Sequence, residues 1–234
     1  MRRVLRHPVT IWLSLGVLML AVMGFAVPSA QRGVAAFLGD TVARGRLTGG
    51  LAAEFGIYLH MMAGAIITCL AVVQWAGPLR RHAPRLHRAS GRLLAPLALI
   101  TATGGLVYIM VEGTIGGALM DVGFGLYGGL MVIAALQTRR FAIARDLTRH
   151  RAWGLRLIVL CLGSWLYRVH YGLWFAGTCS IGPDLCGAGV QPDFRGLFDQ
   201  ITIFAFYLPY LGLVEWHLRR GRPTRSAPLE KPAQ

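Results

Sequence analysis

The sequence predicts an all-α fold: a polytopic membrane helical bundle of six transmembrane helices with a pseudo-twofold repeat of two hairpins. Of the 234 residues, 55% are hydrophobic and only 15% are charged, and the mean hydropathy is +0.53. This composition excludes an ordinary water-soluble domain and indicates a membrane protein. A motif that occurs twice in the chain predicts the repeat.

Six windows contain the roughly 20 mostly apolar residues that a bilayer span needs. They lie at 9–28, 51–77, 93–111, 117–137, 153–176 and 198–217. The first follows a basic amino terminus, as the core of a signal peptide does, but it is longer than the about 7 to 15 residues of such a core. We therefore expect an anchor there, and a single transmembrane domain over 1–220.

Two polar segments flank these spans. Residues 29–50 suit either a short helix lying in the membrane interface or a plain connecting loop. Residues 221–234 are rich in Pro, Arg and Ser, and we expect a disordered cytoplasmic tail.

The net charge of +14 comes from 24 Lys and Arg against 10 Asp and Glu. Most of these cations fall on one side of the predicted spans. The other side has only Arg32, Arg44, Arg46 and Arg195. The positive-inside rule then predicts both termini in the cytoplasm of a bacterial inner membrane. We therefore expect these cations to lie at the bilayer surface, and the positive charge does not indicate binding of nucleic acid.

The four cysteines fit this topology. Cys179 and Cys186 lie in an outer loop, where we expect a disulfide in preference to two free thiols. Cys69 and Cys161 are single residues within spans, and we expect small core side chains there. The chain has no CxxCH or HExxH motif, so covalent haem attachment and the common zinc sites lack support.

The repeated motif reads His-Arg-Ala-x-Gly and begins at His87 and at His150, each time followed by a further arginine. Each copy opens a helix, where basic residues oppose the macrodipole by up to ~1 kcal/mol each. We therefore expect an anion at these turns, either lipid phosphate alone or a cofactor carboxylate or quinone oxygen. The residues of this inner site are His87, His150, Arg88, Arg92, Arg151 and Arg156.

Two resemblances rest on these residues. The first resemblance is to a family of predicted bacterial membrane proteins catalogued as a domain of unknown function. It rests on the run from His60 and Gln74 to Gly91-Arg92 and on the run from His150-Arg151 to Arg168. More distantly, the chain is similar to the two-haem transmembrane b-type cytochromes of the ascorbate-reducible kind. That similarity implies two histidine pairs within four core helices, but the fourth predicted helix of this chain has no histidine.

Two histidines lie within the predicted spans at similar depth. His60 lies about 9 Å from Glu54, and His170 lies about 10 Å from Gly177, at 1.5 Å per residue. Gly56, Ala63 and Gly64 leave room for a flat ring beside His60. We expect either a bis-histidine haem b held by His60 and His170, or two unrelated core histidines bonded to backbone.

Arg168 is costly near mid-bilayer, by about 2.5 to 3.5 kcal/mol, and needs a partner. A haem propionate is one candidate, but Arg168 lies roughly 200° around the helix from His170. We therefore prefer a salt bridge to Asp121 or Glu112 over a propionate or Glu54. In the fourth helix, Gly125-x-x-x-Gly129 suits close helix packing, or a porphyrin face.

The sequence thus predicts a membrane-embedded, b-type cytochrome-like electron-transfer protein, a candidate transmembrane oxidoreductase. His60 and His170 would hold an outer haem b. His87 and His150 would hold an inner haem, or line a site for a quinone or for a quinol or protein electron donor. The alternatives are a small-solute or ion transporter or channel, with Arg168, His60, Asp121 and Glu112 along its path, and a non-catalytic membrane subunit.

Overall fold

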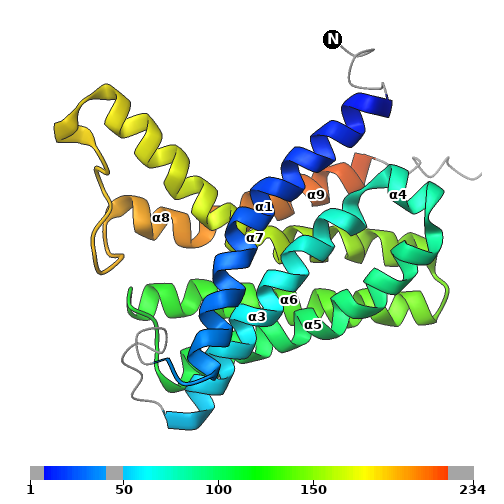
Figure 1. The fold of residues 1–234 in the computed structure, drawn as a ribbon, viewed down its shortest axis with the longest axis horizontal. Helices are drawn as coiled ribbons and strands as arrows, with labels where there is room; N and C mark the ends of the chain where they lie inside the picture. Colours follow the sequence, from blue (N-terminus) through cyan, green and yellow to red (C-terminus); the bar gives the residue numbers. More distant parts are fainter. Residues whose placement is uncertain (1–7, 41–49, 221–234) are drawn as a thin grey trace, which may run out of the picture.

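The structure is a computed structural model that describes residues 8–40 and 50–220, and these residues are helical apart from short connections (Figure 1). The helices are α1 (Pro8–Phe37), α3 (Gly50–Trp75), α4 (Gly77–His82), α5 (Pro84–Val111), α6 (Ala118–Ile143), α7 (Leu147–Ile181), the 3-10 helix η2 (Pro183–Leu185), α8 (Leu197–Ala205) and α9 (Leu208–Arg220). Six helical segments are long and apolar enough to cross a membrane, with α8 and α9 together forming the sixth. The predicted multi-pass membrane bundle is confirmed, whereas the predicted disordered tail lies outside the described residues.

Helices α3, α5, α6 and α7 form a closed four-helix ring. Within it α3 packs on α5, α5 on α6, α6 on α7, and α7 on α3. A twofold rotation that exchanges the hairpins α3–α5 and α6–α7 would also exchange the contacts α5–α6 and α7–α3. The ring therefore has the neighbour pattern that the sequence repeat predicts, and α5 and α7 lie diagonally across it. Helix α1 packs on α3, outside the ring.

Polar side chains inside the ring bond to backbone carbonyls of neighbouring helices. Tyr127 of α6 donates to the Leu160 carbonyl of α7, and the Thr68 hydroxyl of α3 lies 3.2 Å from the Cys161 carbonyl of α7. Hydrogen bonds of this kind are expected in a bilayer, which offers no water to a buried hydroxyl.

Glycine brings α3 and α5 into very close contact. A Cβ atom on Gly104 would lie 2.5 Å from the Gly56 carbonyl oxygen, so neither position tolerates a larger residue without movement. In α6, Gly123 and Gly128 make the tight contacts, with Ile203 and Leu106. A Cβ atom on Gly125 or Gly129 would meet nothing within 4 Å. The predicted packing role of Gly125-x-x-x-Gly129 is therefore wrong.

Two elements differ from the predicted spans. Residues 29–37 continue α1, because this Ala-containing stretch packs on α3. Gly33 lies against Met62, and the ring centroids of Phe37 and Phe55 are 5.9 Å apart. The interfacial helix or loop predicted for 29–50 is wrong for this part. The sixth span breaks into α8 and α9, because Pro209 lacks an N–H and its ring would clash with the carbonyl four residues earlier.

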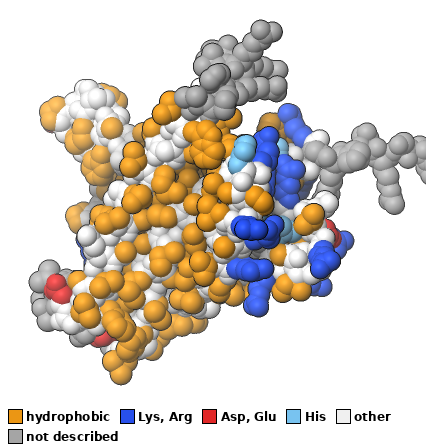
Figure 2. Space-filling model, turned by 45° about the vertical axis from the view of Figure 1, so that its right-hand side comes forward, with side chains coloured by type: hydrophobic (Ala, Val, Ile, Leu, Met, Phe, Trp, Pro, Cys, Tyr) orange, Lys and Arg blue, Asp and Glu red, His pale blue; other side chains and the backbone are white. Residues whose placement is uncertain are grey.

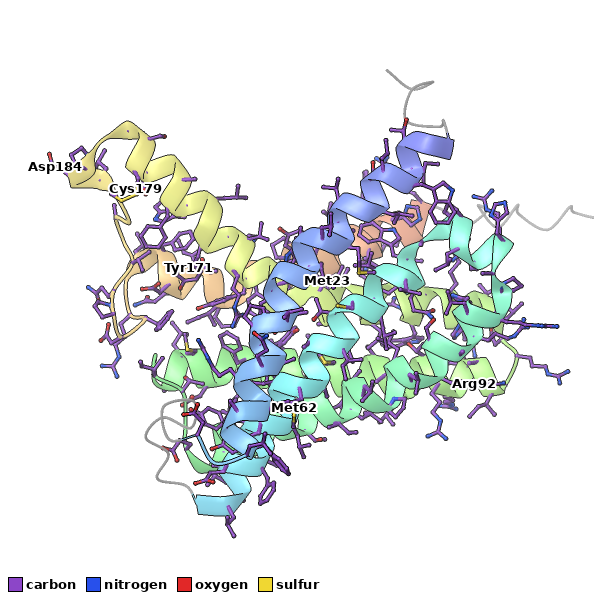
Figure 3. The ribbon with its side chains drawn as sticks, viewed as in Figure 1. Met23, Met62, Arg92, Tyr171, Cys179 and Asp184 are labelled. Carbon is purple, nitrogen blue, oxygen red and sulfur yellow. A yellow bond between two sulfur atoms is a disulfide. The ribbon has the colours of Figure 1, made fainter. Side chains whose placement is uncertain are left out.

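The end of α7 leaves the ring and forms a cap with η2 and α8 (Figure 3). The predicted disulfide is present here, between Cys179 and Cys186. Asp199, which is fully buried, accepts hydrogen bonds from the Tyr171 hydroxyl at 2.6 Å, the Gln191 N–H at 2.8 Å and the Gly196 N–H at 2.9 Å. This carboxylate therefore ties α7, the following loop and α8 together.

Arginine side chains gather at the opposite end of the bundle, which we call the basic end (Figure 2). It consists of α4, the start of α5, the α6–α7 turn and the end of α9. Its arginines include Arg80, Arg81, Arg85, Arg88, Arg139, Arg140, Arg145, Arg149, Arg219 and Arg220. This asymmetry between the two ends matches the one inferred from the sequence.

Candidate functional site at the basic end

His87 and His150 open the two diagonal helices of the ring at the basic end. Each is the fourth residue of its helix, α5 or α7, and each is half-buried. Both helices begin at this end of the ring. The structure therefore places the two histidines that the sequence repeat relates at the same end of the bundle.

The two imidazoles have different hydrogen bonding. His150 Nδ1 lies 3.0 Å from the Thr138 carbonyl oxygen of α6, so this nitrogen donates a hydrogen bond, and Nε2 is the nitrogen that a neutral ring would offer to a ligand. The imidazole of His87 makes no hydrogen bond within residues 8–40 and 50–220, although its Nδ1 is buried. A buried ring nitrogen without a partner is costly unless a ligand that the protein binds satisfies it.

The turn that carries His87 is fixed by a side chain from α3. Gln74 Nε2 donates to the His87 carbonyl at 2.8 Å and to the Ser90 hydroxyl at 2.6 Å. A Cβ atom on Gly91 would lie 3.4 Å from the same Nε2 atom. Gln74 was not among the site residues predicted from the sequence, although Gln137 at the end of α6 occupies the equivalent position of the second hairpin, thirteen residues before His150.

The arginines of the predicted inner site fall into two groups. Arg88, Arg92 and Arg151 are exposed and make no hydrogen bond or ion pair within the described part of the chain. Figure 3 labels Arg92 near the basic end. Arg156 instead forms a two-pronged ion pair with Glu215 of α9, with its Nη2 atom 3.0 Å from Oε2, and it stacks on Trp153. Arg156 is therefore neutralised within the protein, and the other three remain available to an anion.

The predicted outer histidine pair is not brought to a common ligand. His60 Nδ1 lies 2.8 Å from the Thr101 carbonyl oxygen of α5, and a Cβ atom on Gly105 would lie 2.8 Å from the same nitrogen. The small residues of α3 that were expected to leave room for a flat ring beside His60 pack directly against helix α5 instead. His170 Nε2 lies 2.9 Å from the Tyr210 hydroxyl of α9, because α7 has by then turned away toward the cap.

A small, mostly apolar cavity lies beside His60 at the centre of the ring. Its volume is about 60 Å³, and all four helices line it, with polar groups from His60, Thr101, Tyr127 and Ser164. A cavity of this size holds water molecules. It is far below the roughly 300 Å³ or more of a typical cofactor site.

Arg168 does not form the salt bridge that the sequence suggested. Its guanidinium Nη1 atom donates to the Ser164 carbonyl of its own helix at 2.9 Å and lies over the Phe25 ring of α1, 4.5 Å from the centroid. Asp121 instead accepts a hydrogen bond from the Thr114 N–H at 2.7 Å. Among the described residues no ion pair joins Arg168 to Asp121 or Glu112, so that prediction is wrong.

The two histidine pairs differ in how well they fit a haem b, which needs two nitrogen donors on one iron. His60 and His170 do not fit, because their rings bond to different helices and the cavity beside His60 is small. His87 and His150 differ from them only in their donor atoms: His87 Nδ1 is buried without a partner among the described residues, and His150 has one ring nitrogen fixed by a hydrogen bond and one without. No group of three or more His, Cys, Asp or Glu that could hold a metal ion occurs within the described residues.

Fold and site together define a multi-pass helical membrane protein with paired histidines at one end of a four-helix ring. Residues 57–183 match the family described as "Predicted membrane protein (DUF2306)", and the chain belongs to this family. The matched region contains nearly all of the ring and the histidines discussed above, but not α1, α8 or α9. No curated protein and no solved structure matches the chain.

Proposed function

We propose that this protein is a membrane-embedded, b-type cytochrome-like electron carrier with one haem b, held by His87 and His150. The observation that carries the proposal is the buried, unpartnered Nδ1 of His87 at the same helix position as His150 on the diagonal helix. Haem b, when bound, would supply one-electron chemistry between ferric and ferrous iron. Cofactor sites in helix bundles are commonly built from side chains on facing helices.

The surrounding residues support this assignment. The hydrogen bond from His150 Nδ1 to the Thr138 carbonyl fixes the ring orientation and makes Nε2 the donor nitrogen, as hydrogen bonds to the other ring nitrogen do for metal-binding histidines. Gln74 holds the backbone of the turn that carries His87. Arg88, Arg92 and Arg151 are exposed nearby and would pair with propionate carboxylates.

The same arginines also suit a quinone or an electron donor at this end of the bundle. We place the basic end in the cytoplasm, because the arginines of α4, the α6–α7 turn and α9 follow the positive-inside pattern of a bacterial inner membrane. Electrons would then enter from a cytoplasmic redox partner or from a quinol in the inner leaflet.

The test is a difference spectrum, dithionite-reduced minus air-oxidised, of the detergent-purified full chain from haem-replete cells. We expect sharp b-type bands in the wild type and their loss in His87→Ala and in His150→Ala. His60→Ala and His170→Ala are the matched controls and should keep the bands. A folded but colourless wild-type protein, or bands that depend on His60 and His170 instead, would refute the assignment.

A second candidate function, transport of a proton or small ion, is favoured by the polar groups of His60, Thr101, Tyr127 and Ser164 around the cavity beside His60. All four helices of the ring line this cavity, and intramembrane polar groups commonly mark such paths. Flux of protons into proteoliposomes that is lost in His60→Gln, together with a colourless protein, would favour this function over electron transfer.

A further inference from the structure

A second group of basic residues lies away from the basic end, where α1 approaches α7. Arg168 of α7 is exposed on a surface that the bilayer would cover. Among the described residues it donates one hydrogen bond, to the Ser164 carbonyl, and lies over the Phe25 ring. A guanidinium has five N–H donors. Most of the donors of Arg168 therefore have no acceptor within the described part of the chain.

Arg32 of α1 lies on the same side of its helix as Phe25. It follows Phe25 by seven residues, which is two helical turns, so both side chains share a face and are about 10 Å apart along the axis. Arg32 is exposed and has no hydrogen bond or ion pair among the described residues. The Arg168 guanidinium lies over the Phe25 ring, and Arg32 is on the same face of α1 as Phe25, so both arginines lie on the same side of α1.

Among the described residues, no ion pair joins Arg32 or Arg168 to a carboxylate. The three ion pairs of residues 8–40 and 50–220 involve Arg149, Arg156 and Arg195. The neighbouring segment 41–49, which the structure does not describe, has no Asp or Glu in its sequence. Two like charges on an apolar surface repel one another and attract an anion.

We infer that Arg32 and Arg168 together bind a phosphate group between α1 and α7. Guanidinium groups bind phosphate through paired, charge-assisted hydrogen bonds. The phosphate can belong to the headgroup of an anionic phospholipid in the leaflet opposite the basic end, or to free inorganic phosphate. This site shares no residue with the proposed haem site and does not depend on it.

The lipid source is tested with the full chain in nanodiscs of phosphatidylcholine that contain a small fraction of phosphatidylglycerol. Native mass spectrometry counts the phosphatidylglycerol that the released protein retains. We expect retention to fall by about tenfold or more in Arg168→Gln and in Arg32→Gln, because each loses a hydrogen-bonding charge. Arg85→Gln, which removes an exposed arginine at the basic end, is the matched control and should retain the lipid.

The free-anion source is tested by adding inorganic phosphate to the protein in neutral detergent. A rise in melting temperature in the wild type and in Arg85→Gln, but not in Arg32→Gln, would identify free phosphate as a ligand. If Arg168→Gln does not fold, Arg32→Gln decides both experiments, because Arg32 is exposed and makes no contact that folding needs. Equal lipid retention in wild type and Arg32→Gln, with no effect of phosphate, would overturn the inference.

Discussion

His87 and His150 are both the fourth residue of their helices, and those helices, α5 and α7, face each other across the four-helix ring. The internal repeat thus places two imidazoles at one depth, at the end of the bundle where the arginines gather. Each histidine-bearing turn is also bonded to the helix before it, through Gln74 in one hairpin and through the Thr138 carbonyl in the other. Anchored turns of this kind hold ligand side chains in one geometry before a ligand binds.

The first prediction concerns Gln74 as a positioning residue. Gln74→Met removes the donor to the His87 carbonyl and the Ser90 hydroxyl, so we expect a loss of unfolding free energy of about 1 kcal/mol. If His87 binds haem, the reduction potential should shift as well. The matched control is Gln137→Met, because Gln137 makes no hydrogen bond within the described residues. Thermal unfolding in detergent and a redox titration measure the two effects, and equal losses in both variants would contradict a specific role for Gln74.

The second prediction concerns the contact between α3 and α5. Gly104→Ala would place a Cβ atom 2.5 Å from the Gly56 carbonyl oxygen, so the helices must separate, at a cost of about 1 to 3 kcal/mol. The separation would also disturb the bond between His60 and the Thr101 carbonyl. Gly129→Ala meets nothing within 4 Å and should be neutral or gain about 0.5 kcal/mol. Denaturant-induced unfolding of both variants checks this contrast, and a Gly104→Ala protein as stable as Gly129→Ala would count against it.

The sequence was sufficient to predict the spans and the repeat because hydropathy and motif spacing are local properties. Six apolar windows correspond to the six candidate spans, and the two His-Arg-Ala-x-Gly runs fall in the first turns of α5 and α7. The Cys179–Cys186 pair was also predictable, because a short Gly- and Pro-containing loop separates two cysteines on one side of the membrane.

The partners of the buried polar side chains were not predictable, because they depend on how helices pack. Equal depth suggested that His60 and His170 share a ligand. The close approach at Gly56 and Gly104 turns His60 to α5, and the departure of α7 toward the cap turns His170 to Tyr210. Depth fixes one coordinate of a side chain in a bundle and says nothing about which neighbour it faces. Arg168 shows the same limit, because its aromatic partner comes from α1.

The third prediction concerns the ion pair between α7 and α9. Arg156 and Glu215 are partly exposed, so their coupling should be modest, about 1 kcal/mol in a double-mutant cycle of Arg156→Met and Glu215→Gln. We expect each single variant to loosen the packing of α9 on α7, because each removes one partner of this ion pair. Among the described residues, only α9 places a carboxylate beside Arg156. Haem-dependent absorbance should survive in both, because Arg156 is already neutralised. A coupling energy near zero would show that this ion pair does not hold α9 against α7.

The last prediction concerns the cap. It is held together by the disulfide, by the buried Asp199 and by the stacked rings of Trp174 and Phe198. A disulfide that closes so short a loop should stabilise the cap by on the order of 2 kcal/mol. Reductant should therefore lower the melting temperature of the wild type, but not of the double variant Cys179→Ser/Cys186→Ser. Cys69 and Cys161 are the only other cysteines of the chain and lie within the bundle, so alkylation of the reduced native protein should modify Cys179 and Cys186 first.

The cap packs on the carboxyl-terminal end of α7, beyond the four-helix ring, so its loosening should leave the basic end intact. The double serine variant should therefore keep the haem-dependent absorbance of the wild type while the protease sensitivity of the 183–196 loop increases. Loss of the absorbance in this variant would mean that the cap stabilises the whole ring. In that case Asp199→Asn, which weakens the same cap by a different bond, should reproduce the loss.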